Sequence, residues 1–402
     1  MTRKFWAGLD VGVESTSLCV INDAGEVLQN ATCPSTLKNI HREIRWMKRR
    51  RFARVGLEAA GGATIARGLR SLGYAVDLYE GRQLSTFLRM RRNKTDAGDA
   101  IGIAEAGRIG ASVVSKVYLK SLESQSLQSR LTIRRHIIRQ RIATTNLLCR
   151  QLELFGGRVR GCTRSMQLHD KVEAEIRSLF GKTSTPLPTE LRDLLQQCEQ
   201  LILYQKAVDR EFARLAFDNE VCRRFMEIPG VGPICALSFF AAVGEPDRFS
   251  RSANIGSYFG LTPKLHQSGL TVRSGRISKM GHAATRTALV HASVSFMRWS
   301  DADSELRNWT LRVEERRGRA KSRVALARKL ATIMLAMWKS GENYKSNSVH
   351  PTSESHFRSA AESDPDAPQT HLSAEVVLGP ILSNDTNEVS NEPTASDAPA
   401  LA

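Results

Sequence analysis

The sequence lacks the features that would commit the protein to a membrane or to a disulfide framework. Its first residues, MTRKFWAGLDVG, hold no apolar run of signal-peptide length, and no segment approaches the roughly eighteen apolar residues that a spanning helix needs. The seven cysteines are scattered and odd in number, without any C-x-x-C pair. Neither a zinc ribbon nor a set of disulfides is indicated. We therefore expect a soluble, cytoplasmic protein.

Acidic residues are also scarce until the chain nears its end. The net charge is +17, yet the stretch from His350 onward carries nine acids against one arginine. Without that stretch, whose own net charge is −8, the chain carries +25. Such an excess favours a polyanionic partner, most commonly nucleic acid, although ordinary solubility charge is a simpler explanation. Residues 346–402 are predicted to form a disordered acidic tail.

The pattern of apolar residues divides the rest of the chain into three regions. Strands alternate with helices over residues 1–115, which is typical of an α/β domain. Two long amphipathic helices follow within residues 116–220, and helices of that kind usually pack as a pair. Residues 221–345 alternate Gly-rich loops with helices, so we expect a mainly α domain.

Four acidic side chains stand where predicted strands end or a predicted helix begins. Asp10 ends the first strand, and Glu58 ends a later one. Asp96 and Asp99 lie three residues apart at a helix start, behind the good N-cap residue Thr95. Such positions can meet at one edge of an α/β sheet, where converging carboxylates would need cations between them. Mg²⁺ prefers oxygen ligands, so the four together favour a magnesium site, although each acid alone could be a strand-end or helix-start residue.

Basic residues stand directly in front of this acidic helix. Arg91, Arg92 and Lys94 precede it in "RMRRNKTDAGDA". The basic side chains could hold nucleic acid while the acids hold the metal.

Several short motifs of the chain resemble those of a known family. "GLDVG", "GLEAAGG" and "NKTDAGDA" are similar to the DEDD motifs of insertion-sequence transposases related to the Piv pilin-gene invertase, some of which are bridge-RNA-guided recombinases. "IPGVGPICALSFFAAVG", "YFGLTPKLHQSG" and "GRISKMGHAATR" are similar to the C-terminal transposase domain of that family. The resemblance covers residues 5 to about 340, with both halves in the expected order. One departure is the segment Val11 to Glu14, where many members carry a polar S-K-type sequence.

The resemblance implies a RuvC-like, ribonuclease H-type N-terminal domain, a coiled coil used in assembly, and a C-terminal domain with a nucleophilic serine. The implied metal ligands are Asp10, Glu58, Asp96 and Asp99. Ser268, followed by a glycine, best matches the family's Ser-Gly position.

Ser278 is the second choice for the nucleophile, because the neighbouring Lys279 could contact phosphate. Independently of the family, the Gly-x-Gly turn at Gly230 and Gly232 leaves backbone N–H groups that could bind a nucleic-acid phosphate. A plain turn between helices explains these glycines equally well.

The predicted function is therefore that of an insertion-sequence transposase, which cuts and rejoins donor and target DNA through a Mg²⁺-dependent 5′-phosphoserine intermediate. A structured noncoding guide RNA and a homo-oligomer, dimer or tetramer, are expected as partners. Two alternatives stay open. One is a Holliday-junction-type nuclease in which metal-activated water attacks, and the other is a non-catalytic nucleic-acid-binding protein.

Overall fold

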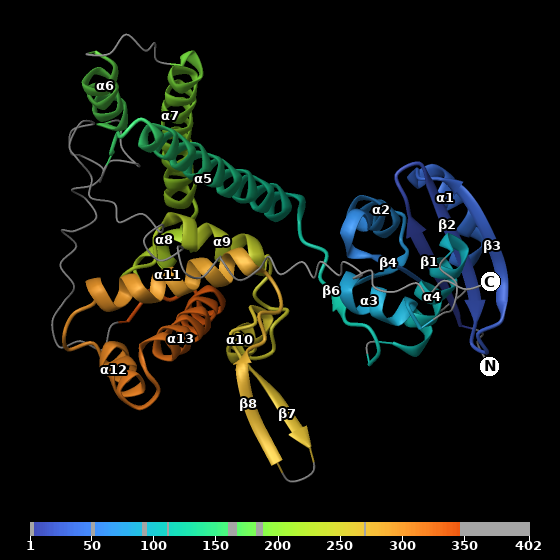
Figure 1. Ribbon diagram of the computed structural model, residues 1–402. Helices are drawn as coiled ribbons and strands as arrows, with labels where there is room; N and C mark the ends of the chain where they lie inside the picture. The colour runs from blue at the N-terminus through green and yellow to red at the C-terminus, as the bar shows by residue number, and fades with distance from the viewer. Residues whose placement is uncertain are drawn as a thin grey trace, which may run out of the picture. The chain divides into compact units, whose positions relative to one another are not determined.

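The computed structural model describes residues 4–49, 53–90, 95–110, 112–159, 167–181, 188–268 and 271–345. The chain divides into two compact units, the first ending at Leu122 and the second beginning at Glu123 (Figure 1). The basic residues Arg91, Arg92 and Lys94 lie outside the described residues, and so does the predicted acidic tail, 346–402.

The first unit is built on a six-stranded mixed sheet with the order β3-β2-β1-β4-β5-β6. β1 pairs antiparallel with β2 and parallel with β4, and β4 pairs parallel with β5. The predicted alternation of strands and helices is confirmed, and with it the α/β class of this region. The strands are β1 (Phe5–Val11), β2 (Ser15–Asn22), β3 (Val27–Pro34), β4 (Ala53–Glu58), β5 (Ala75–Tyr79) and β6 (Lys116–Val117).

Helices cover both faces of this sheet. One face packs against α1 (Leu37–Ile44) and α2 (Ala59–Ser71), whose buried aliphatic residues join those of β1, β2, β4 and β5 in one core cluster. The other face packs against α3 (Gly81–Leu88) and α4 (Asp96–Ile109). A short 3₁₀ helix, η1 (Arg45–Arg49), follows α1. The core thus lies in two layers, one on each side of the sheet.

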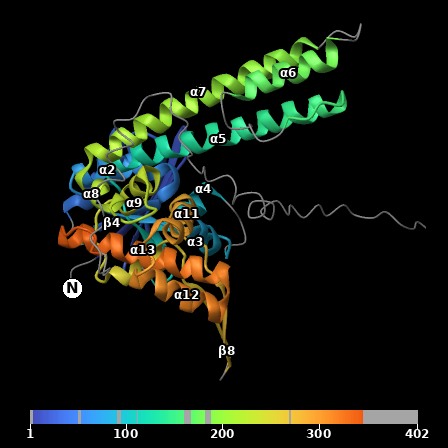
Figure 2. The same ribbon diagram turned by 90° about the vertical axis from the view of Figure 1, so that its left-hand side faces the viewer.

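The second unit begins with a long helical arm, which Figure 2 shows along its length. α5 (Leu122–Leu154) and α7 (Thr189–Asp218) run antiparallel, because the early residue Arg134 bonds to the late residue Asp209 and the later Thr145 bonds to Cys198. α6 (Gln167–Phe180) packs with both at the far end of the arm. The predicted pairing of two long helices is confirmed; their use as a coiled coil stays a prediction.

The remainder of the second unit packs helices around the strongly apolar α9 (Pro233–Val243), most of whose residues are buried. The region is mainly helical, as expected. A β-hairpin, β7 (Pro263–Ser268) with β8 (Thr271–Ile277), stands where the sequence suggested only a Gly-rich loop. The helices are α8 (Glu220–Met226), η2 (Ser252–Asn254), α10 (Ile255–Tyr258), α11 (Ala283–Trp299), α12 (Glu305–Arg317) and α13 (Arg319–Ser340).

The described helices include none with the length and apolar composition that crossing a bilayer requires. The six cysteines of the described residues are thiols, five of them buried. Burial raises the pKa of Cys222 and of Cys235 to about 12, so both stay protonated at neutral pH.

Candidate functional site

The position of α4 is fixed by small residues on its inner face. Thr95 caps the helix by accepting a hydrogen bond from the N–H of Gly98 at 3.0 Å, as predicted. Gly8 of β1 meets the helix so closely that an added Cβ would stand 2.0 Å from the carbonyl oxygen of Ala100. Ala100 and Ala104 are buried beneath this contact. The run of Ala and Gly in "DAGDAIGIAEAGR" therefore serves close packing of a helix on a sheet.

The same contacts show where the first turn of α4 lies. Trp6 meets Gly107 and Gly8 meets Ala100, so α4 runs antiparallel to β1. The two strand residues from Gly8 to Asp10 span about 6.6 Å. The four helix residues from Ala100 back to Asp96 span about 6 Å. Asp10 and Asp96 thus lie about equally far beyond the Gly8 contact, toward the same sheet edge.

Glu58 reaches this edge from the neighbouring strand. Leu9 and Leu57 are paired in register and belong to the core under α1 and α2. Because side chains alternate along a strand, the next residues, Asp10 and Glu58, point to the face that α4 covers. Glu58 is also in register with Tyr79, which is buried among α4 residues.

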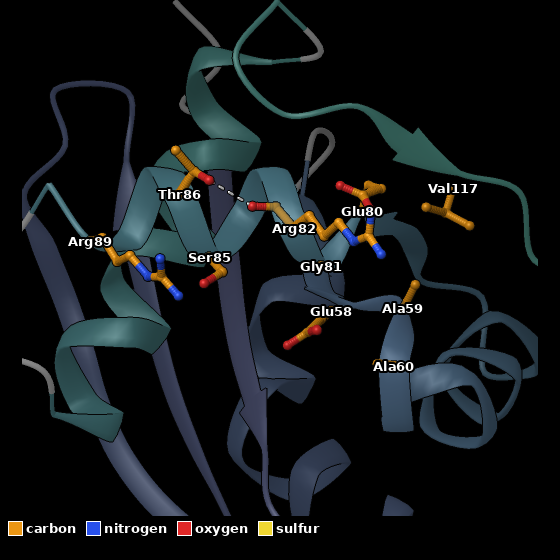
Figure 3. Close-up of a pocket in the computed structure, with 10 residues that line it drawn as sticks. All are labelled: Glu58, Ala59, Ala60, Glu80, Gly81, Arg82, Ser85, Thr86, Arg89 and Val117. Carbon is orange, nitrogen blue, oxygen red and sulfur yellow. Dashed lines mark hydrogen bonds between the residues drawn. The ribbon is translucent and has the colours of Figure 1, made fainter. Parts of the chain in front are cut away.

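The side chain of Glu58 lines an open pocket of about 650 Å³ between the end of β4 and α3 (Figure 3). Its carboxylate lies against the backbone of Gly81, where an added Cβ would stand 2.4 Å from Oε1. Glu80, on the same pocket, accepts a hydrogen bond from the N–H of Gln83 and caps α3. The Glu58 carboxylate thus lies close to the start of α3.

The four acids suit a hard divalent cation in their chemistry, because all are carboxylates and such cations prefer oxygen ligands. Their elements bring them to one sheet edge. The side chains do not close around one point: among the described residues, no three Asp, Glu, His or Cys side chains stand close enough to hold a metal ion. A shared metal site for Asp10, Glu58, Asp96 and Asp99 thus stays a prediction.

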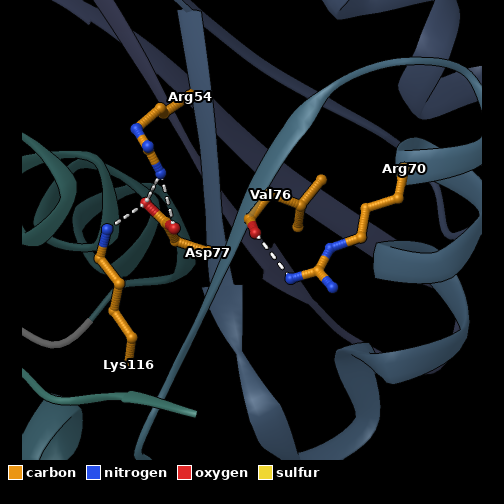
Figure 4. Close-up of polar contacts among 5 residues, drawn as sticks. All are labelled: Arg54, Arg70, Val76, Asp77 and Lys116. Carbon is orange, nitrogen blue, oxygen red and sulfur yellow. Dashed lines mark hydrogen bonds and ion pairs between the residues drawn. The ribbon is translucent and has the colours of Figure 1, made fainter. Parts of the chain in front are cut away.

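A fifth acid on this face is already neutralised. Asp77 of β5 is buried, and both its oxygens accept hydrogen bonds from Arg54, at 2.8 and 2.9 Å (Figure 4). The ammonium of Lys116 lies 2.8 Å from Oδ2 of the same carboxylate. Buried charge needs such partners, so Asp77 belongs to the framework of the sheet. Burial raises the pKa of the nearby Tyr79, and the charge of Asp77 raises it further.

Ser268 lies in the second unit, at the exposed end of β7. It is paired with Thr271, and the next pair on the same side of the hairpin is His266 with Arg273. The hairpin extends away from α9, α11 and α13 (Figure 1). The first-choice nucleophile is therefore presented on a projecting element beside a histidine and an arginine, which sequence reasoning did not connect with it.

Ser278 and Lys279 stand at the base of the hairpin, where backbone packs on backbone. The N–H of Ser278 donates to the carbonyl of Thr262 at 2.8 Å, and that of Lys279 to the carbonyl of Gly260 at 3.2 Å. Lys279 has a positive φ of 53° and is exposed. Ser278 is half-buried and engaged in this packing, which favours Ser268 as the residue that can approach a phosphate.

The two glycines of "IPGVGP" have different surroundings. Gly230 has a φ of +81°, and an added Cβ would stand 2.4 Å from the backbone nitrogen of Phe296 in α11. Gly232 is the N-cap of α9 and has open space around its Cα. Close packing explains Gly230, so the predicted phosphate contact is left to Gly232 and the helix start behind it.

Comparisons with known proteins identify the family of both regions. Residues 7–156, which contain the four acids, match a DEDD transposase model of the IS110 type. Residues 222–307, which contain Ser268 and Lys279, match the model described as "Transposase IS116/IS110/IS902 family".

Individual relatives point to the same family. The chain is 30% identical over 349 residues to the transposase for insertion sequence element IS1111A of Coxiella burnetii, covering 84% of this chain and 90% of that protein. It is 32% identical over 289 residues to a probable family 20 transposase of Pseudomonas aeruginosa, covering 70% and 83%. A pilin gene-inverting protein of Moraxella bovis is 31% identical over 115 residues, 27% of this chain and 34% of the relative. The chain belongs to the IS110/IS116 family of DEDD insertion-sequence transposases, which are divalent-metal-dependent enzymes that cleave and join DNA.

Proposed function

We propose that this transposase excises and inserts its element through a covalent 5′-phosphoserine at Ser268, with Mg²⁺ as the metal of the four acids. The observation that carries the proposal is the exposed Ser268 on the projecting hairpin, together with the four carboxylates directed to one edge of a sheet in the other unit. The first unit is the RuvC-like domain in this proposal, and the arm of α5 and α7 joins subunits in a dimer or tetramer. Acids and serine from different subunits then act on one DNA junction.

The reaction consists of two balanced phosphoryl transfers. The Ser268 hydroxyl oxygen bonds to phosphorus as the bond from phosphorus to the 3′ oxygen breaks, and the proton lost by the serine is balanced by one gained by the leaving oxygen. A 3′-hydroxyl of the partner strand then attacks the phosphoserine and releases Ser268. Because each step exchanges one phosphate ester for another, no ATP is consumed.

A bound divalent ion supplies positive charge to the phosphate and stabilises the attacking and leaving oxygens. Asp10, Glu58, Asp96 and Asp99 would hold it. Residues 1–349 carry most of the positive charge, which suits both DNA and a structured noncoding RNA. In this proposal the RNA pairs with donor and target DNA and carries the sequence specificity, while the protein contacts backbone.

The test uses protein purified from cells that also transcribe the flanking DNA of the element, incubated with Mg²⁺ and end-labelled junction DNA. Products are resolved on a denaturing gel before and after protease, beside Ser268→Ala, Ser278→Ala and Asp10→Ala. We expect a slow band that protease removes, absent from Ser268→Ala and Asp10→Ala and present in Ser278→Ala.

Other outcomes would support the alternative nucleophile or one of the alternative functions. Loss of the band in Ser278→Ala alone would transfer the nucleophile to Ser278. Cut DNA without a protein adduct would establish a nuclease that uses water as the nucleophile. DNA that is bound but not cut, although the guide RNA is supplied, would establish a non-catalytic binding protein. Ribonuclease treatment before the assay should abolish cutting if RNA guides the enzyme.

A further inference from the structure

One side of α3 is fixed to the first unit. Leu84 is buried in the core under α4. The Glu80 carboxylate accepts the N–H of Gln83 at 2.8 Å, and the side-chain oxygen of Gln83 accepts the N–H of Ser115 at 2.8 Å. Caps and buried apolar contacts of this kind hold a helix in place. The opposite side of α3 is therefore a rigid surface.

That free side carries two arginines. Arg82 and Arg89 are exposed, and both line the pocket that contains Glu58, with Ser85 between them (Figure 3). No described residue forms an ion pair or a side-chain hydrogen bond with either guanidinium. By contrast, Arg42, an exposed arginine of α1 on the far face of the sheet, is paired with Glu43 at 3.2 Å. The α3 face thus offers unpaired positive charge next to an acid of the candidate metal centre.

The spacing of the two arginines matches a nucleic-acid strand. They are seven positions apart (82 to 89), which is about 10.5 Å along a helix. Phosphates recur along a DNA strand, one per about 3.4 Å of the duplex axis, so a strand that runs along α3 can present separate phosphates to the two arginines. A strand lying along α3 could therefore contact both side chains.

We propose that the face of α3 formed by Arg82, Ser85 and Arg89 binds the phosphate backbone of the DNA strand that enters the acid edge at Glu58. This rests on the proposed function, in which that edge holds the metal for phosphodiester chemistry. Arginine suits the role because its guanidinium stays charged and donates bidentate hydrogen bonds to phosphate. The two residues position DNA and take no part in bond making.

The experiment measures DNA binding without cleavage. Full-length protein with its co-expressed RNA is titrated, in EDTA, with a labelled duplex carrying the end of the element, over 50 to 300 mM salt. We compare wild type, Arg82→Gln/Arg89→Gln, Arg82→Lys/Arg89→Lys and the matched control Arg42→Gln. Each lost phosphate contact reduces the magnitude of the slope of log K against log salt by about 0.9. The slope of the double glutamine variant should therefore be smaller in magnitude by about 1.8. The lysine pair should keep most of the slope, and Arg42→Gln should match wild type.

Three results would overturn the proposal: an unchanged slope in the glutamine pair, an equal loss in Arg42→Gln, or a loss seen with an RNA duplex of the same sequence and not with DNA. Thermal melting checks that the double glutamine variant folds. If it does not fold, the test depends on the double lysine variant. A folded lysine variant that binds DNA without the wild-type salt slope then counts against the proposal.

A second readout separates this idea from the proposed function. In Mg²⁺, the glutamine pair should need more protein for half-maximal cutting but reach the wild-type rate at saturation, as expected for lost ground-state binding. If Asp10→Ala still cuts DNA, the acid edge is not the metal centre and the proposed function fails, whatever the salt slopes show.

Discussion

Single backbone positions show why glycine occurs where it does in the second unit. Gly230 and Gly232 are two residues apart in one turn, yet only Gly230 has a positive φ and a backbone neighbour within 3 Å of an added Cβ. A side chain at Gly230 would both strain the backbone and press into α11. The same turn therefore contains one glycine required for folding and one that folding does not require.

We expect Gly230→Ala to lower the free energy of unfolding by at least about 2 kcal/mol, because strain and overlap add. Gly232→Ala should stay within about 1 kcal/mol of wild type. Urea unfolding followed by circular dichroism measures both. If Gly232→Ala is stable but binds DNA less tightly, the predicted phosphate contact gains support; equal destabilisation of the two variants would contradict the structural explanation.

Lys279 is the one non-glycine residue with positive φ among the described residues, and backbone strain outside glycine often marks a functional position. Lys279→Gly should raise stability by about 1 kcal/mol, since glycine adopts this conformation freely, while Lys279→Ala should not. If the lysine contacts DNA, both variants should weaken binding to a similar extent. Thermal melting and a DNA titration measured on the same samples separate the two effects, and a lysine needed only for folding would leave DNA binding intact in Lys279→Gly.

At the scale of elements, the decisive contact is the docking of α4 on β1. The helix can approach the sheet only because Gly8 lacks a side chain, and this approach places Asp96 and Asp99 near the end of β1. A residue with no side chain of its own thus controls the position of the acids on α4.

Gly8→Ala should destabilise the first unit by about 3 kcal/mol and reduce metal-dependent cutting, because the added Cβ would stand 2.0 Å from the Ala100 oxygen and α4 would have to move. Gly68→Ala in α2 is the matched control, since its added Cβ meets only the end of the flexible Leu37 side chain. Chemical denaturation and the cutting assay should show a large effect for the first variant and a small one for the second. Comparable losses in both would mean that α4 is not held as described.

At the scale of the whole molecule, stability should depend on pH through a half-buried histidine. Burial lowers the pKa of His291 in α11 below its ordinary value. The unfolded chain then binds more protons than the folded chain as the pH falls from neutrality, so stability is lost toward low pH.

The melting temperature should fall between pH 7.5 and pH 5.5, and fall less in His291→Gln, in which the titrating group is gone. His266→Gln on the exposed hairpin serves as control and should keep the wild-type dependence. Differential scanning calorimetry across this range measures the three proteins. An identical pH dependence in wild type and His291→Gln would show that His291 does not contribute.

The sequence by itself determined the elements whose pattern is local. The strands and helices of the first unit, the Thr95 cap and the long helices follow from apolar periodicity and capping chemistry within short windows, and the family follows from motifs of the same length. The β7–β8 hairpin was missed, because its Ser, Gly and Arg residues carry little apolar alternation and its pairing is stabilised by cross-strand hydrogen bonds.

Only the tertiary structure decided which side chains share a surface. The pairing of Asp77 with Arg54 and Lys116 and the contact of Glu58 with Gly81 join residues from different elements. No local pattern encodes these contacts, because they depend on strand register and on how closely α3 and α4 approach the sheet. Four acids and a serine were selected from the sequence; the fold places Asp10 and Glu58 on the face of the sheet that α4 covers and Ser268 at the end of a projecting hairpin.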